Sequence, residues 1–359
     1  MRLAFVLAVA AACGDNLAAH SDAHVDAKAD AAPPDAFGVD TLFETGLCVD
    51  KACTQISAGI QTYTPRWALW ADGATKQRWF QLPPNGTIDT TDMDHWVFPV
   101  GTKFWKEFDA LDGSGNNVRV ETRFIEHVAN TGAESDWYYV PFQWNATEDD
   151  TTAVPNGASN ADGTMHDIPS RVDCKTCHDD LQPTRILGFG AIQLDEVAGG
   201  SGSGSGSGSD AGSGDIALAD LIAAGALSAP PAGSGSPYFP MQATGVTADA
   251  LGYLHANCGH CHNPTSMIYG AQTKMSFRLE VATLDDTANT PTYLSAVNQT
   301  TNMIVNGHTI IVDPGMPDMS VLIDRFEATP GTPEHMPALA TKVTDPTGDA
   351  TLRAWITGL

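Results

Sequence analysis

Two pentapeptides place two cysteines and a histidine in the order Cys-x-x-Cys-His, at 174–178 and 258–262. Two thiols three positions apart can each form a thioether to one vinyl group of a single porphyrin, and the histidine beside the second thiol can ligate the iron. The predicted thioether cysteines are Cys174, Cys177, Cys258 and Cys261, and the predicted axial histidines are His178 and His262. The sequence therefore predicts a chain that folds around two covalently attached haem c groups.

The N-terminus predicts export. A basic start precedes ten apolar residues, 3–12, a run that suits a secretory signal and is too short to span a bilayer permanently. Cys13 follows three alanines, which resembles a bacterial lipoprotein processing site, with Ala10 where leucine is usual. We expect a signal peptide at 1–12 and a lipidated Cys13 that anchors the protein on the periplasmic side of a bacterial membrane. Without lipidation, the protein would be soluble in the periplasm or secreted.

Two of the seven cysteines, Cys48 and Cys53, remain once the haem cysteines and Cys13 are assigned. Export would place them in an oxidising compartment, where neighbouring thiols form disulfides. We predict a disulfide between them, with two free thiols as the alternative.

The formal charge of −25 argues against a nucleic-acid partner, because the phosphate backbone would repel such a surface. The same acidity suits an encounter with a basic redox partner in the periplasm or at the membrane. It also suits the simple solubility of an exported protein.

Composition divides the chain into segments. Residues 13–37 have almost no bulky apolar side chains and predict a disordered tether. Residues 38–165 predict a β-rich domain, a sandwich or small barrel. Residues 166–198 carry the first motif, 199–243 form a Gly/Ser-rich linker and connection, and 244–359 predict a cytochrome c domain with the second motif.

The β-rich prediction depends on short segments with strand character. Arg119 to Glu126 alternates apolar and polar residues, the period of a half-buried strand. Aromatic and β-branched runs at 79–82, 96–98 and 137–140 are separated by turn sequences. Together these patterns predict several short strands.

The C-terminal segment has helical spacing on both sides of the second motif. Thr247 is a predicted cap for a helix from Ala248 to Asn257, and the last helix has apolar residues at Leu352 and Trp355. In cytochromes c the first and last helices cross beside the haem, and these two segments resemble that pair.

A methionine-proline pair, Met336-Pro337, lies in a loop before the last helix and resembles the distal ligand of small cytochromes c. A thioether opposite an imidazole raises the reduction potential of the iron. We predict Met336 as the sixth ligand of the second haem, with Met316, Met319 and His335 as fallbacks.

No comparable pair follows the first motif. The conceivable sixth ligands are Met165, His166, Met241, His95 and His127. The first haem is therefore either six-coordinate through an unassigned residue or five-coordinate and open to a small ligand.

Three longer segments, 63–76, 94–104 and 253–262, are similar to a group of exported bacterial dihaem c-type proteins without an assigned role. The resemblance implies two haems and a β-rich N-terminal half. The expected fold is multidomain α+β, with a β-rich domain followed by a mainly α-helical, class I-like cytochrome c domain.

Three function classes follow. The leading hypothesis is electron transfer through two covalent haems. The alternative is a peroxidase- or oxidase-like haem enzyme whose open first haem receives electrons from the second. Asp94, His95, Lys103 and Lys106 are the candidate distal groups for that chemistry. A third class is a binding module whose β-rich domain recognises a partner or carbohydrate.

Overall fold

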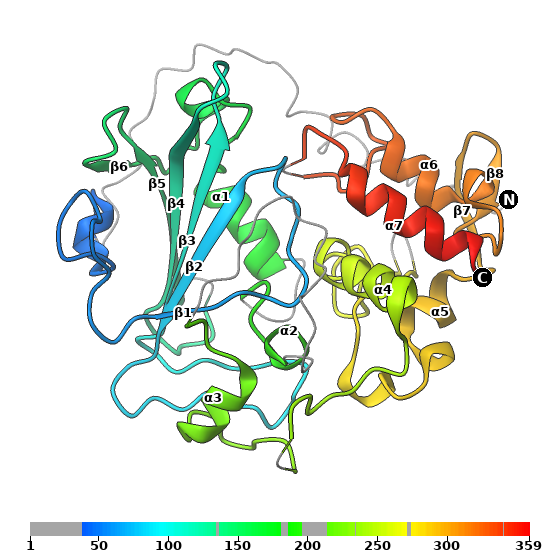
Figure 1. The fold of residues 1–359 in the computed structure, drawn as a ribbon, viewed down its shortest axis with the longest axis horizontal. Coiled ribbons are helices and arrows are strands. Elements are labelled where there is room, and N and C mark those ends of the chain that lie inside the picture. Colours follow the sequence, from blue (N-terminus) through cyan, green and yellow to red (C-terminus); the bar gives the residue numbers. More distant parts are fainter. Residues whose placement is uncertain are drawn as a thin grey trace, which may run out of the picture.

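The computed structural model describes residues 38–133, 136–180, 186–195, 214–233, 235–270, 274–339 and 341–359. The predicted signal peptide, the tether with Cys13 and most of the Gly/Ser-rich stretch lie outside the described residues. The described chain has a β-sheet half and a helical half (Figure 1), so the α+β prediction is confirmed.

The sheet half contains one antiparallel sheet in which each strand pairs with its neighbour in sequence, from β1 to β6. The strands are β1 (Gln61–Thr62), β2 (Thr75–Gln81), β3 (Lys103–Leu111), β4 (Asn117–His127), β5 (Trp137–Trp144) and β6 (Thr151–Ala153). A sandwich or closed barrel was the wrong prediction: in the described chain β1 and β6 are edge strands and do not pair. The sheet does not have to close into a barrel to bury its apolar side chains, because other segments of the chain cover both of its faces.

The strand patterns in the sequence correspond to real strands with one exception. The alternating segment becomes β4, and the aromatic runs near 79 and 137 lie in β2 and β5. The run at 96–98 makes only an isolated bridge, between Val97 and Asp89. Trp96 and Phe98 are buried there, so their apolar character reflects core packing and not ladder formation.

One face of the sheet is covered by the segment that begins the described chain. Its short 3-10 helix, η2 (Leu42–Thr45), buries Leu42 against the sheet tryptophans, and the indole of Trp105 donates to the Thr45 hydroxyl at 2.9 Å. In the same segment Cys48 and Cys53 are joined by a disulfide, with Cα atoms 4.9 Å apart. We call this side of the sheet the outer face.

The opposite side, the inner face, carries a second aromatic cluster. Phe189 lies at its centre, with ring centroids 4.8 Å from Tyr63 and from Phe80 and 5.1 Å from Phe104. The short helices on this side are α1 (Arg171–Lys175), α2 (Ala191–Leu194) and α3 (Leu218–Ala223) (Figure 1). The inner face therefore turns toward the first motif and toward the helical half.

The helical half contains both predicted helices. Its elements are α4 (Gly245–Asn257), α5 (Pro291–Ala296), β7 (Thr300–Val305), β8 (His308–Ile310), α6 (Val321–Glu327) and α7 (Pro346–Thr357). Helix α4 begins three residues before the predicted start, after the extended Thr244, so Thr247 lies inside the first turn and is not the cap. Asp345 caps α7 by accepting a hydrogen bond from the Thr347 amide at 2.9 Å.

Helices α4 and α7 pack against each other, as expected from the resemblance (Figure 1). The ring of Tyr253 lies directly against Gly348, where a Cβ atom would overlap it. Leu254 and Leu352 are fully buried in the same cluster. The crossing thus fixes α4, at whose C-terminus the second motif begins. None of the described helices is both long and apolar enough to cross a bilayer.

Candidate haem-attachment centres

The first motif lies in a short helical segment that a capping box starts. The Ser170 hydroxyl accepts from the Asp173 amide at 3.2 Å, and the Asp173 carboxylate accepts from the Ser170 amide at 2.9 Å. Helix α1 continues into a π-helical turn, η5 (Thr176–Asp180). Cys174 therefore lies one turn before Cys177 and His178. Single π-helical turns of this kind are frequent at functional sites.

Both cysteines of the first motif are half-buried and neither is in a disulfide. Cys174 packs against the inner-face aromatic cluster, and burial raises its pKa to about 12. Burial also raises the pKa of Cys177, against the opposing charge of Arg123. The His178 ring lies 5.7 Å from the ring of Tyr139 on β5. Sheet strands therefore form one wall of this centre.

Three cations lie in one row on that wall. Arg78 on β2 is the register partner of Lys106 on β3, and Lys106 is the partner of Arg123 on β4. We call Arg78, Lys106 and Arg123 the cation row. Burial, followed by the charges of neighbouring cations, lowers the pKa of Lys106 well below its usual value.

A buried carboxylate supports one end of the cation row. Glu121 holds Arg123 with two bonds, to Nε at 2.7 Å and to Nη2 at 3.0 Å. Its second oxygen also lies 2.7 Å from Nε2 of His166. The Arg123 guanidinium and the His166 ring both lie against Phe108. Lys106 and His166 are candidates from the sequence, but the network that joins Glu121, Arg123 and His166 is not predictable from it, because pairing between separate strands has no local signal.

The second motif turns directly off the end of α4. The Cys258 amide donates to the Leu254 carbonyl at 2.9 Å, and the His262 amide donates to the Cys258 carbonyl at 2.8 Å. Neither Cys258 nor Cys261 is in a disulfide, and burial raises both of their pKa values, that of Cys258 to about 12. The motif is thus a continuation of the helix that α7 fixes.

The predicted axial histidine of this motif is enclosed. His262 is 8 % exposed, and its ring stands edge-on to Phe277 with centroids 5.4 Å apart. Burial, and then the charges of His260 and Arg325, lower its pKa to about 4. Its Nδ1 atom is buried without a hydrogen-bond partner among the described residues. A neutral imidazole in an apolar wall is the form that can ligate iron.

The loop with Met336 is tied to the same neighbourhood. The Met336 amide donates to the carbonyl of Arg325 at 2.8 Å, and the charge of Arg325 reaches His262. The predicted fallbacks differ among themselves: Met316 and Met319 are 51 % and 43 % exposed beside the turn that enters α6, whereas His335 is buried. Arg325 of α6 therefore connects the loop that carries His335 and Met336 to the surroundings of His262.

A segment of the sheet half closes around the second motif. Asn257, just before Cys258, accepts from the Trp70 amide at 2.7 Å and donates to the Ala68 carbonyl at 3.2 Å. The Trp67 ring packs on Gly252 of α4, where a Cβ atom would overlap it. Trp67, Ala68 and Trp70 belong to the 63–76 segment, one of the three segments that carry the family resemblance.

The loop after Met336 is held by the same half. The Trp70 indole donates to the Val343 carbonyl at 2.8 Å. Asp72 accepts from the amides of Lys342 and Val343, and the Lys342 ammonium lies 2.6 Å from the Asp167 carboxylate. The sheet half therefore positions both sides of the second centre.

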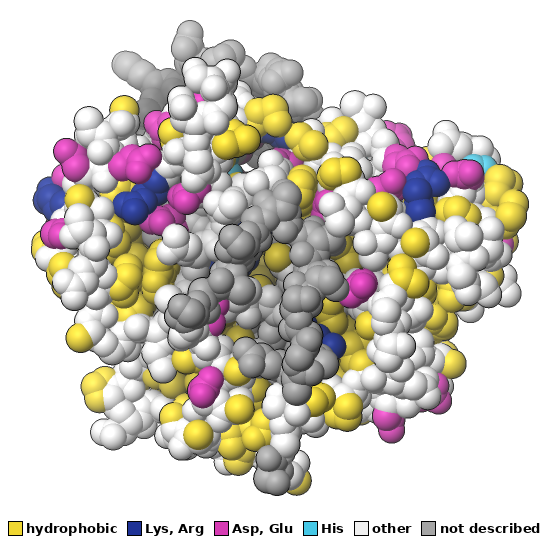
Figure 2. All heavy atoms as spheres, in the orientation of Figure 1, with side chains coloured by type: hydrophobic (Ala, Val, Ile, Leu, Met, Phe, Trp, Pro, Cys, Tyr) yellow, Lys and Arg dark blue, Asp and Glu magenta, His cyan; other side chains and the backbone are white. Residues whose placement is uncertain are grey.

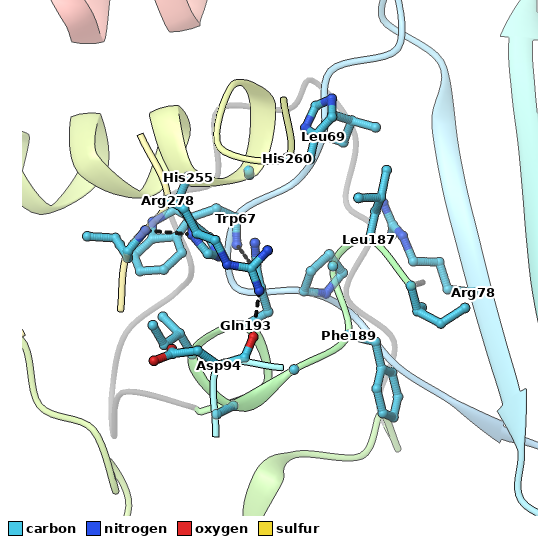
Figure 3. A pocket seen from close by; sticks show the side chains of 18 of the residues that line it. Trp67, Leu69, Arg78, Asp94, Leu187, Phe189, Gln193, His255, His260 and Arg278 are labelled. Atoms are coloured by element: carbon cyan, nitrogen blue, oxygen red, sulfur yellow. Dashed lines mark hydrogen bonds between the residues drawn. The ribbon is translucent and has the colours of Figure 1, made fainter. Parts of the chain in front are cut away.

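The two motifs approach each other between the halves. Burial raises the pKa of Cys261 and the charge of Cys177 raises it further, so thiols of different motifs lie within electrostatic reach. An open pocket between the two halves is lined by one residue of the second motif, His260. Arg78 enters it from the sheet side, and His255, His260 and Arg278 line it from the helical side (Figure 3).

The pocket's histidines are held in place by local contacts. His255 accepts from the Leu279 amide at 3.0 Å. Burial lowers the pKa of His255 to about 3 and that of His260 to about 4. Arg278 donates to the Asp94 carbonyl at 2.6 Å and so links this wall to the sheet half.

The five conceivable sixth ligands of the first haem are engaged or placed elsewhere. His95 pairs with Asp92, and His166 with Glu121. His127 bonds the Phe98 carbonyl at 2.9 Å and stacks on Trp137. Met165 is 54 % exposed, and Met241 packs in the cluster around Trp67. None of these five residues is therefore placed as a sixth ligand of the first haem.

The residues present fit the predicted cofactor in kind: two pairs of half-buried cysteines outside any disulfide, each followed by a histidine, and a buried His262 nitrogen without a hydrogen-bond partner among the described residues. No group of three or more His, Cys, Asp or Glu side chains in the described chain is arranged to hold a bare metal ion. Comparisons with protein-family models, curated proteins and solved structures find no match for this chain.

Proposed function

We propose that this chain is an exported dihaem c-type cytochrome that carries electrons through two covalently attached haems. The observation that carries the proposal is that the two motifs, 80 or more residues apart in sequence, bring Cys177 and Cys261 within electrostatic reach of each other. A bound haem iron supplies one-electron redox chemistry. The chain's own residues hold the cofactor and keep water away from it.

Each centre has residues suited to those tasks. The proposed thioether cysteines lie on short helical turns, and burial raises the pKa values of Cys174 and Cys258 to about 12. His178 and His262 are the proposed proximal ligands, and Met336 is the proposed distal ligand of the second iron. We assign 244–359 to a class I-like cytochrome c domain because α4, the second motif, the Met336 loop and α7 follow one another in the order that such domains use.

The surface fits a basic redox partner in the periplasm or at the membrane. On the face shown in Figure 2, acidic side chains are scattered over both halves, while basic ones gather at few places. The net charge of −25 would draw a basic partner electrostatically. Anchoring through a lipidated Cys13 would keep the protein beside a membrane partner.

The test is the mass of the protein after export through a c-type maturation system. We expect the mass of two haems on the wild type and of one haem on each double variant, Cys174→Ala/Cys177→Ala and Cys258→Ala/Cys261→Ala. The matched control, Cys48→Ala/Cys53→Ala, should keep both haems. An unmodified wild-type mass would contradict the proposal.

A haem enzyme is the second candidate, because the five conceivable sixth ligands of the first haem are engaged or placed elsewhere. The variant Cys258→Ala/Cys261→Ala isolates the first haem. Carbon monoxide should change its ferrous spectrum when the sixth position is open. A spectrum that ignores carbon monoxide and peroxide would exclude the enzyme and leave the electron carrier.

A further inference from the structure

Helix α6 packs beside the second motif. The ring of Phe326 on α6 stands edge-on to the ring of Tyr253 on α4, with centroids 6.0 Å apart. Both rings belong to the cluster against which Cys258 packs, and that cluster includes Phe277, whose ring contacts the ring of His262. Helix α6 therefore borders the place of a haem attached at this motif.

Arg325 is the cation on this helix. It is half-buried, and its charge reaches His262. Its guanidinium donates from Nη2 to the Pro333 carbonyl at 3.1 Å, and among the described residues no carboxylate lies within ion-pair distance of it. Burial lowers the pKa of Arg325, and the exposed Glu334 is the acid whose charge acts against this. A guanidinium has several N–H donors, so its one bond leaves most of them for another partner.

The acidic residues of α6 are bound to other partners. Asp324 lies 2.7 Å from Nδ1 of His308, and Glu327 pairs with Arg353 of α7. Arg353 has two further carboxylate partners. Within the described part of the helical half, the arginine on α7 is thus saturated with carboxylates, whereas Arg325 on α6 has none.

His335 is a second polar group that lacks a partner in the same place. It is 2 % exposed, and neither ring nitrogen has a hydrogen-bond partner among the described residues. The Ala328 carbonyl lies near the ring, but not in hydrogen-bond geometry. Arg325 is bonded to the chain on both sides of His335, to Pro333 through its guanidinium and to the Met336 amide through its carbonyl, at 2.8 Å. Because an unpaired buried polar group costs free energy, we expect His335 to have a partner in the working protein.

Asp72 is the acidic side chain whose charge reaches His335. Its two carboxylate oxygens already accept from the amide of Lys342, and one of them also accepts from the amide of Val343. The acids near this loop therefore leave Arg325 and His335 to a carboxylate from outside the described chain.

We propose that Arg325 and His335 form a carboxylate-binding site that holds a propionate of the haem attached at the second motif. This inference rests on the proposed dihaem function. The propionates of haem are anions, and they lie on the porphyrin edge opposite the vinyl groups that form the thioethers. Burial alone raises the pKa of Cys258, so the Arg325 charge that reaches His262 does not extend to this thiol. Such a placement suits the propionate edge of the haem and not the thioether edge.

The two side chains suit a carboxylate in complementary ways. A guanidinium forms charge-assisted and often bidentate hydrogen bonds with a carboxylate, and an imidazole N–H can donate to the same group. Both interactions offset negative charge near the iron and so favour the ferrous state. Arg325 and His335 would therefore raise the reduction potential of the second haem in addition to Met336.

The experiment measures both midpoint potentials of the full-length holoprotein at pH 8 by spectroelectrochemical titration. The variant Cys174→Ala/Cys177→Ala, which should carry the second haem alone, assigns the potential of that haem. Arg325→Gln removes the charge, and Arg325→Lys keeps it. Arg353→Gln is the matched control, because protein carboxylates already bind the Arg353 guanidinium.

We expect Arg325→Gln to lower the potential of the second haem alone. At a fixed solution potential, the ferrous-to-ferric ratio of that haem should fall on the order of tenfold, as for a unit charge about 10 Å from the iron in a partly buried site. His335→Phe should lower the ratio roughly threefold through the loss of one hydrogen bond, and His335→Gln, which keeps a donor, should restore it. Arg325→Lys and Arg353→Gln should leave both potentials unchanged.

Carbon monoxide separates this role from a role in positioning Met336. The Met336 amide bonds the backbone carbonyl of Arg325, and that bond remains in Arg325→Gln. The second haem of this variant should therefore still ignore carbon monoxide. A fall in potential together with carbon monoxide binding would show that Arg325 acts by positioning Met336 and would overturn the propionate assignment.

Three further results would count against different claims. A wild-type mass without two haems would refute the proposed dihaem function itself. Two attached haems whose potentials ignore both Arg325→Gln and His335→Phe would refute the propionate site alone. A wild-type potential that shifts with added phosphate, and does so no longer in Arg325→Gln, would show a site for a free anion and overturn the assignment to a propionate.

Discussion

The two Cys-x-x-Cys-His segments share one pattern of cysteines and histidine but have different surroundings. The first begins within a short capped helix, α1, and lies beside a sheet wall that contains the cation row and the buried Glu121. The second continues from a long helix, α4, beside α7 and the Met336 loop. The same five-residue pattern is thus placed by strand pairing in one case and by helix packing in the other, and the surroundings decide what each centre can do.

The largest effect is expected from Glu121→Gln, which would break the wall of the first centre. The variant leaves Arg123 and His166 without their shared carboxylate, and breaking a buried ion pair costs about 3–5 kcal/mol. Urea unfolding monitored by tryptophan fluorescence would measure it. Glu126→Gln, on the same strand but only half-buried, is the control. Equal costs for the two variants would show that Glu121 has no special role.

A pH titration of stability sharpens the contrast between the faces of the sheet. Burial raises the pKa of Glu107, on the outer face, to about 7. The folded state therefore holds the Glu107 proton more tightly than the unfolded state does. The contribution of Glu107 to the free energy of unfolding is complete below pH 4.5 and is lost as the pH rises toward 7. The loss is roughly 3 kcal/mol at 1.36 kcal/mol per pKa unit.

Glu107→Gln should flatten the fall in unfolding free energy between pH 5 and 7, as urea melts at several pH values would record. Burial would raise the pKa of Glu121, but the ion pair with Arg123 and the bond from His166 outweigh it and lower that pKa. The contribution of Glu121 to the free energy of unfolding is therefore lost as the pH falls, at lower pH than that of Glu107. An unchanged slope in Glu107→Gln would contradict the assignment.

A smaller effect is expected from Gly252→Ala, which would disturb the second centre. The added methyl group overlaps the Trp67 ring, and overpacking of this kind typically costs 1–3 kcal/mol. Gly358→Ala is the control, because a Cβ there makes only ordinary contacts. We expect the absorption of the second haem to change in Gly252→Ala and that of the first to stay constant; the reverse pattern would contradict the packing described for Trp67.

Met336→Ala should cost least in stability, about 1 kcal/mol for a half-buried side chain, yet it tests the difference between the centres most directly. We expect the second haem to bind carbon monoxide and its reduction potential to fall. Met316→Ala, at an exposed position, should do neither. A spectrum of Met336→Ala identical to that of the wild type would remove Met336 as the ligand.

Much of the fold could be predicted because its signals are local. The polarity alternation around Val120 predicted β4, and the apolar spacing before Asn257 predicted the helix that carries the second motif. That helix starts three residues earlier than predicted, because the backbone leaves the extended conformation at Thr244 and Thr247 already lies in the first turn. The open sheet was mistaken for a sandwich or barrel because strand patterns do not reveal what covers each face.

The sequence by itself determined the two haem-type motifs, the strands and helices around them and the Met-Pro pair, since each depends on residues a few positions apart. Only the tertiary structure decided that Cys177 lies within electrostatic reach of Cys261 and that Asn257 is held by the 68–70 segment. It alone aligned Arg78, Lys106 and Arg123 in one row. Their alignment depends on the register between strands far apart in sequence, and a shift of one residue would send Lys106 to the opposite face.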